Sequence, residues 1–167
     1  AMKLVPDPVI LQRVRNLLDA EAGRVAGPTI AIHVSARKVP QRWPTERFIA
    51  LMQQLHARCN ARFMLFWAPG GSDNPTHPGD DDKAREIVAA TAGLPVLAYR
   101  TESLDELIGG IAACDSMICS DGGAMHVGAA LGKEIPPEIN LFVDDVTKQA
   151  LTIAQTVALV CALIKEA

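Results

Sequence analysis

The clearest structural signal in the sequence lies at residues 116–131, which read SMICSDGGAMHVGAAL. A short apolar run, 116–120, ends at an acidic residue and two glycines, and an Ala-rich segment follows. This order predicts a buried β-strand, a turn and a helix. Two glycines at such a turn allow close approach to the backbone and unusual φ angles. The stretch is neither a GxGxxG fingerprint nor a P-loop, so it does not indicate a dinucleotide or ATPase site.

The alternation of strand and helix continues on both sides of this stretch. Apolar runs predict strands at 29–34, 61–67 and 94–97, and a further short apolar run lies at 139–143. We expect helices over 8–22, 45–57 and 146–165, and others starting near 80 and 103. Thr45 is expected to be an N-cap, and Ser103 and Glu106 have capping-box spacing. Apolar strands separated by amphipathic helices predict an α/β fold with a Rossmann-like, doubly wound parallel sheet.

Length, charge and cysteine content exclude several classes of protein. The chain has 167 residues, which suits one domain. Its formal net charge of −3 argues against a general nucleic-acid binder, which normally carries a basic excess. No run of about 18 apolar residues occurs, so the sequence predicts no transmembrane segment. The four cysteines form no CxxC pair, so we expect no zinc site and interpret them as reduced thiols of a cytosolic protein.

Polar side chains follow the first predicted strand, at the edge where doubly wound domains bind ligands. Ser35, Arg37, Lys38 and Arg42 could clamp a diphosphate, and the alternative is a solvated basic loop. His33 lies inside the apolar strand, so we expect a packed, hydrogen-bonded core histidine. We interpret the tryptophan at position 43 as a packing anchor for this loop.

Two further loops carry polar residues. Gly122 and Gly123 precede a helix start whose free N–H groups and positive dipole end suit phosphate, and His126 could add a donor. Alternatively, Asp121 is an ordinary N-cap and His126 a surface or half-buried histidine. The acidic helix start at 80–82 either accepts hydrogen bonds from ribose hydroxyls or compensates the helix dipole.

Read in order, these segments resemble the carboxyl-terminal half of the heptosyltransferases, glycosyltransferase family 9. The matching stretches lie between about residues 29 and 133: residues 30–37, RWPTERF at 42–48, WAPGG at 67–71, SLDEL at 103–107 and DGGAMHVGAALG at 121–132. The last stretch is the most specific, because it is similar to the family's Asp-Thr/Ser-Gly-x-x-His signature, which leads into an Ala-rich helix.

The resemblance implies a GT-B architecture of two Rossmann-like domains, with this chain as the carboxyl-terminal one. Residues 1–28 would be a leading helix and interdomain linker, and residues 29–167 the nucleotide-sugar-binding domain. The implied donor- and phosphate-binding residues are Ser35, Arg37, Arg42, Asp121, Gly122, Gly123 and His126. The implied nucleoside-binding residues are Asp80, Thr101 and Glu102. Gln41 stands where the family often has Lys, so Arg42, Arg37 or Lys38 would substitute.

The function implied by the resemblance is donor binding for an inverting, metal-independent heptosyltransferase of lipopolysaccharide core biosynthesis. The ligand would be ADP-heptose or a related nucleotide sugar, with no cofactor and no metal. The general base and the site for a lipid-linked saccharide acceptor would lie in an amino-terminal domain, so this chain alone would be inactive. The expected location is cytoplasmic, either free or at the inner face of the bacterial inner membrane. Two alternatives stay open: a non-catalytic nucleotide- or phosphate-binding module, and half of a sugar-nucleotide epimerase.

Overall fold

The computed structural model of the chain describes residues 3–120, 122–133 and 153–166. Its elements are α1 (Pro8–Glu21), β1 (Thr29–His33), the 3-10 helix η1 (Val39–Gln41), α2 (Thr45–Cys59), β2 (Arg62–Phe66), α3 (Asp81–Ala90), β3 (Val96–Ala98), α4 (Leu104–Ala112), β4 (Ser116–Cys119), α5 (Gly123–Ala130) and α7 (Ile153–Glu166). The strands and helices predicted within these residues are confirmed, with bounds shifted by a few residues. The apolar run at 139–143 and the start of the predicted helix at 146 lie outside the described residues.

The strands form a parallel sheet in the order β3-β2-β1-β4. His33, the last residue of β1, pairs with Phe66 of β2 and Cys119 of β4. The chain therefore adds β2 and β3 on one side of β1 and then crosses back to place β4 on the other side. This reversal is the switch point of a doubly wound sheet, where ligands bind at the carboxyl ends of the strands. The predicted fold class is confirmed.

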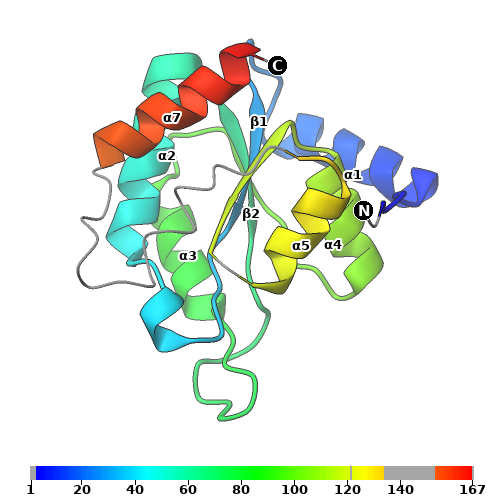
Figure 1. The fold of residues 1–167 in the computed structure, drawn as a ribbon, viewed down its shortest axis with the longest axis vertical. Helices are drawn as coiled ribbons and strands as arrows, with labels where there is room; N and C mark the ends of the chain where they lie inside the picture. The colour runs from blue at the N-terminus through cyan, green and yellow to red at the C-terminus, as the bar shows by residue number, and fades with distance from the viewer. Residues whose placement is uncertain (1–2, 121, 134–152, 167) are drawn as a thin grey trace.

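Helices cover both faces of the sheet (Figure 1). Helices α2, α3 and α7 pack on one face, and α1, α4 and α5 pack on the other. Ile30 and Ile32 of β1 point into the first layer, while Ala31 between them points into the second. In β2, Phe63 and Met64 divide between the layers in the same way. Because both faces of each strand are buried, the strands appear in the sequence as continuous apolar runs.

The start of α2 differs from the prediction. Pro44, not Thr45, occupies the N-cap position, with φ −60° and ψ 145°, and the helix begins at Thr45 itself. The Pro44 carbonyl accepts hydrogen bonds from the N–H groups of Arg47 (3.1 Å) and Phe48 (3.4 Å). The expectation that Thr45 is the N-cap is wrong, because the proline ring already fixes the extended residue that precedes the first turn.

The start of α4 follows the prediction more closely. Ser103 is the N-cap, and its hydroxyl accepts a hydrogen bond from the Glu106 N–H at 3.2 Å. The Glu106 carboxylate accepts from the N–H of Glu102 at 2.7 Å, one residue before the position that a standard capping box uses. Local side chains therefore accept hydrogen bonds from two N–H groups at this helix start.

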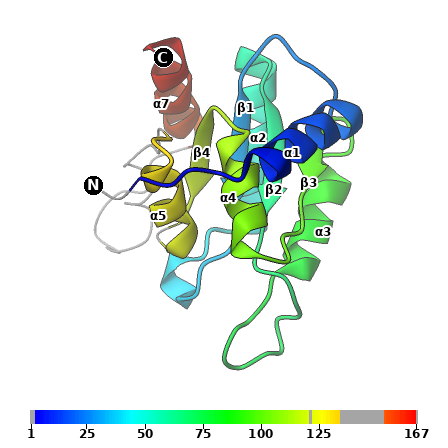
Figure 2. The same ribbon diagram turned by 90° about the vertical axis from the view of Figure 1, so that its right-hand side faces the viewer.

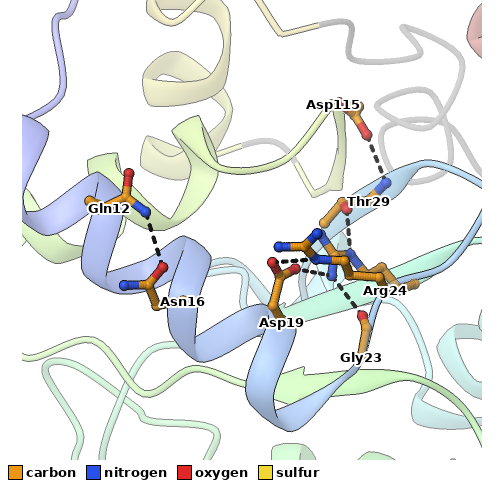
Figure 3. Close-up of polar contacts among 8 residues, drawn as sticks. Gln12, Asn16, Asp19, Gly23, Arg24, Thr29 and Asp115 are labelled. Atoms are coloured by element: carbon orange, nitrogen blue, oxygen red, sulfur yellow. Dashed lines mark hydrogen bonds and ion pairs between the residues drawn. The ribbon is translucent and has the colours of Figure 1, made fainter.

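A polar network at the amino edge of the sheet ties α1 to β1 and β2 (Figure 3). We call Asp19, Gly23, Thr29 and Arg62 the amino-edge clasp. Arg62 donates to Asp19 Oδ1 and to the Gly23 carbonyl, both at 2.7 Å, and to the Thr29 hydroxyl at 2.8 Å. The bond from Arg62 is the main cause that lowers the pKa of Asp19. Since Thr29 and Arg62 begin their strands, the clasp holds the fold at the edge opposite the carboxyl ends of the strands.

Helix α1 also contributes to the core, with Val14 and Leu18 fully buried against the sheet. The division of the chain into a linker up to residue 28 and a domain beyond it stays a prediction. Among the described helices, none combines the length and apolar character that a membrane crossing needs.

Candidate functional site

The carboxyl ends of β1, β2 and β4 surround a cavity of about 560 Å³. Its wall is built from the end of β1 and the loop after it, the loop after β2, and the start of α5. The volume lies within the range of small-molecule sites, which in doubly wound sheets occur at the switch point. Its position agrees with the edge that the sequence pattern indicated.

Ser35 lies on the wall of the cavity just after β1. Its Oγ accepts a hydrogen bond from the N–H of Ala68 at 2.8 Å, which ties the loop after β1 to the loop after β2. A serine hydroxyl has one hydrogen and two lone pairs, so accepting this bond leaves its hydrogen able to donate into the cavity. Ser35 thus lies on the wall of the cavity, and its contact with phosphate stays a prediction.

His33 also lines the cavity, which the sequence pattern did not indicate. The ring is hydrogen-bonded to the backbone of Ser35, as expected of a core histidine, but the residue is only half-buried. Burial lowers the pKa of His33 to about 4, against the smaller opposite effects of the Ser35 backbone and the Asp80 carboxylate. The imidazole is therefore neutral at pH 7, and a neutral imidazole both donates and accepts hydrogen bonds.

The loop after β1 carries three cationic side chains, of which two line the cavity. Arg37 and Lys38 are exposed and line the cavity. Arg42 does not line it, because its Nε donates to the carbonyl of Ala36 at 3.0 Å and so shapes the loop from behind. Gln41, at the position where a lysine was expected from the resemblance, is buried and lines the cavity. Arg37 and Lys38 are thus the cations of this loop that face the ligand space.

The carboxyl-terminal end of this loop is anchored on α2 by Trp43, as predicted. Its ring is buried and meets the Phe48 ring edge to face, with centroids 4.9 Å apart. Lys83 of α3 donates to the Trp43 carbonyl at 2.7 Å, and its Nζ lies 5.1 Å from the centre of the Phe48 ring. Desolvation is the main cause that lowers the pKa of Lys83. These contacts hold the carboxyl-terminal end of the loop after β1 against α2 and α3.

The start of α5 faces the cavity with backbone rather than side chains. Gly122 is the N-cap with an extended φ of 167°, Gly123 is the first helical residue, and both line the cavity. The unusual φ expected for these glycines is not found. A Cβ at either position would meet no heavy atom within 4 Å, and both glycines are exposed. The first N–H groups of a helix have no partner within the helix. His126 is exposed and outside the cavity lining, and Asp121 lies outside the described residues.

The expected nucleoside-binding residues are not brought to this cavity. Asp80 is the half-buried N-cap of α3 and makes no side-chain capping bond, while its charge acts on His33 and Lys83. Thr101 and Glu102 follow β3, outside the cavity lining, and Glu102 is paired with Arg100. Their nucleoside role, like that of Asp80, stays a prediction.

A smaller hollow of about 360 Å³ lies beside β3 and is lined by Trp67, Asp81 and Arg100 among others. The indole Nε1 of Trp67 donates to Asp81 Oδ1 at 2.7 Å, and this bond is the main cause that lowers the pKa of Asp81. Asp81 is the first residue of α3, so this carboxylate also lies where the helix dipole favours negative charge. The acidic helix start therefore has a structural role at Asp81, in line with the dipole interpretation.

Sequence reasoning missed His77 and Pro78, which reach the cavity from the loop after β2. No site residue was predicted in the part of that loop between Gly71 and Asp80. The signal that could have found them is Asn74, whose side chain accepts hydrogen bonds from the N–H groups of Thr76 and His77 and reverses the chain. Across the described part of the chain, no three or more His, Cys, Asp or Glu side chains gather as a metal site would need.

Comparison with known proteins gives a family and several similar structures. The model of glycosyltransferase family 9 (heptosyltransferase) matches residues 9–165. The structure of Escherichia coli ADP-heptose lps heptosyltransferase II is similar with a TM-score of 0.70 and 22% identity, over 98% of this chain and 54% of that one. A family 9 glycosyl transferase from Veillonella parvula gives a TM-score of 0.74 and 16% identity, over 99% and 54%.

A third similar structure is E. coli heptosyltransferase WaaC with ADP, with a TM-score of 0.53 and 21% identity over 75% of this chain and 34% of that one. The chain thus spans about half the length of the first two structures. A sequence comparison with curated proteins finds no match.

Proposed function

The chain belongs to glycosyltransferase family 9, and from this premise we propose that it binds the nucleotide-sugar donor of a heptosyltransferase-like reaction. The donor is ADP-heptose or a closely related nucleotide sugar. Support comes from similar structures whose names refer to an ADP-heptose heptosyltransferase and to WaaC with ADP. The family match favours a glycosyltransferase over half of an epimerase.

The observation that carries the proposal is the convergence of three kinds of anion-binding group on one cavity. The start of α5 presents backbone N–H groups and the positive end of a helix dipole. Ser35 presents a hydroxyl hydrogen, and Arg37 and Lys38 add two positive charges. A diphosphate carries several acceptor oxygens and negative charge, so this set matches the leaving group of a nucleotide sugar.

In the proposed reaction, an acceptor hydroxyl gives its proton to a general base and displaces the nucleoside diphosphate from the anomeric carbon with inversion. The bond between that carbon and the diphosphate oxygen breaks as the acceptor oxygen bonds from the opposite side. Negative charge grows on the departing diphosphate, and Arg37, Lys38 and the α5 N–H groups would stabilise it there. These groups take the place of a divalent cation, which makes the reaction metal-independent.

We further propose that the chain is the carboxyl-terminal, donor-binding half of a two-domain GT-B enzyme acting in lipopolysaccharide core synthesis in the cytoplasm. The general base and the site for the lipid-linked saccharide acceptor would lie in the other half, consistent with the 54% coverage of two similar structures. On this proposal the chain alone binds donor but transfers little sugar.

Calorimetric titration with ADP, UDP and their sugar conjugates tests the proposal. Arg37→Ala should weaken ADP binding about tenfold or more, the factor for losing a charge-assisted hydrogen bond. Arg47→Ala is the matched control, because Arg47 is an exposed arginine on α2 outside the cavity lining. It should leave affinity and melting temperature unchanged. Added EDTA should not alter ADP binding, and a loss of binding with EDTA would refute metal independence.

The result for the unmodified chain separates the proposal from its main alternative. A donor-binding domain should bind a sugar conjugate more tightly than the free nucleotide. Equal affinity for both would favour a non-catalytic nucleotide-binding module. If no nucleotide or conjugate binds at millimolar concentration while the chain is folded, donor binding is refuted.

A further inference from the structure

The loop between β2 and α3 forms an arm whose base and tip are held by hydrogen bonds. We define the arm as residues 70–79, which extend beyond the carboxyl edge of the sheet (Figures 1 and 2). Its base is closed by hydrogen bonds from Gly79 N–H to the Gly71 carbonyl at 2.9 Å and from Asp80 N–H to the Ala68 carbonyl at 2.8 Å. A Cβ added to Gly79 would lie 2.2 Å from the Gly70 oxygen, so the two sides of the arm touch through their backbones.

The tip of the arm is shaped by one side chain. Asn74 Oδ1 accepts hydrogen bonds from the N–H groups of Thr76 at 3.0 Å and His77 at 2.9 Å. This Asx turn reverses the chain and returns His77 and Pro78 to the wall of the cavity. His77 is exposed to solvent, so its side chain meets the cavity from the rim.

The position of the arm indicates which half of a ligand it faces. The cavity spans β4, β1 and β2, with the helix start of α5 following β4 and the arm following β2. The α5 side offers backbone N–H groups for phosphate. The β2 side offers the rings of Pro69 and Pro78 and the imidazole of His77. Two apolar rings beside an aromatic ring that can also hydrogen-bond suit a flat base and a ribose better than a phosphate.

We propose that the arm forms the nucleoside-binding wall of the donor site and that His77 contacts the base or ribose between Pro69 and Pro78. This inference rests on the proposed function, since it assumes that a nucleotide sugar occupies the cavity. It gives the nucleoside a contact within the cavity, whereas Thr101 and Glu102 lie outside the cavity lining. Asn74 is a positioning residue, because it acts on the ligand only through the placement of His77.

Binding of ADP and of inorganic pyrophosphate to the chain, measured by calorimetry, tests the inference. His77→Ala should weaken ADP binding about threefold to tenfold, as expected for one lost contact, and leave pyrophosphate binding unchanged. Thr76→Ala is the matched control, since Thr76 is exposed on the same arm and outside the cavity lining. It should change neither affinity. Unchanged ADP binding by His77→Ala, or equal losses for both ligands, would overturn the inference.

The same titrations separate failure of this inference from failure of the proposed function. If the unmodified chain binds neither ligand, the donor-site proposal fails. If it binds ADP and pyrophosphate equally well, the phosphate site stands and the nucleoside wall is refuted.

A double-mutant cycle tests the role of Asn74. Asn74→Ala should weaken ADP binding as His77→Ala does, and the double variant should be no weaker than His77→Ala alone. Additive losses would overturn the claim that Asn74 acts through His77. The melting temperatures should stay equal, because Asn74 and His77 are both exposed.

Discussion

Replacing Arg62 by methionine should destabilise the chain without changing ligand binding. Arg62 is the centre of the amino-edge clasp, and its side chain is only 16% exposed. Methionine keeps much of the aliphatic stem but removes the hydrogen bonds to the Gly23 carbonyl and the Thr29 hydroxyl. Each such bond is worth about 1–1.5 kcal/mol, so the free energy of unfolding should fall by about 2–3 kcal/mol, with the partly exposed pair with Asp19 left out of the sum.

Urea unfolding followed by circular dichroism measures this loss. For a domain of this size, a loss of that magnitude corresponds to a fall in melting temperature of roughly 4–12 °C. Arg24→Met is the matched control, because Arg24 also pairs with Asp19 at 2.9 Å but its side chain is 85% exposed. This control should change the free energy of unfolding by less than about 0.5 kcal/mol. Equal effects of the two substitutions would refute the reasoning, as would weaker ADP binding by folded Arg62→Met.

Two further predictions follow from perturbed pKa values. The pKa of His33 is lowered from 6.5 to about 4, so the folded chain favours the neutral ring, and this stabilisation is present above about pH 6.5 and lost as the pH falls toward 4. His33→Asn should therefore flatten the loss of unfolding free energy over that window in urea titrations, and an unchanged pH dependence would contradict the prediction. Burial raises the pKa of the Cys59 thiol to about 11 and of the Cys114 thiol to about 12, so both stay protonated near neutral pH. Iodoacetamide should alkylate them far more slowly in the native chain than in the unfolded one, as measured by mass spectrometry, and equal rates would count against their burial.

The strands and helices were predictable because their signals are local. The run at 29–34 is apolar throughout, since β1 is buried on both faces, and Ser103 and Glu106 mark a helix start within four residues. The edge that carries the cavity also followed from the sequence, because the order of strands and helices fixes where parallel strands end. Ser35, Arg37 and the two glycines at the start of α5 line this cavity, and their ligand-binding roles stay predictions.

The remaining site residues depend on contacts that the sequence does not display. His77 reaches the cavity only because the Asn74 side chain and two glycine backbones fold the arm back. Arg42 is a cationic residue of the same loop as Arg37 and Lys38. Its side chain instead donates to the Ala36 carbonyl and supports the loop. His33 could not be told from a core residue, since the end of a strand and its interior have the same apolar pattern.

The closed base of the arm also bears on how this protein can change. The hydrogen bonds at residues 68, 71, 79 and 80 join backbone to backbone, so they do not depend on the side chains of residues 72–78. Residues 72–77 of that segment are exposed, so substitutions there would act on a ligand of the proposed donor site without disturbing the hydrophobic core. If the cavity holds the nucleotide-sugar donor as proposed, donor preference would change through residues 72–78 at little cost in folding, and a library randomised at 72–78 tests this.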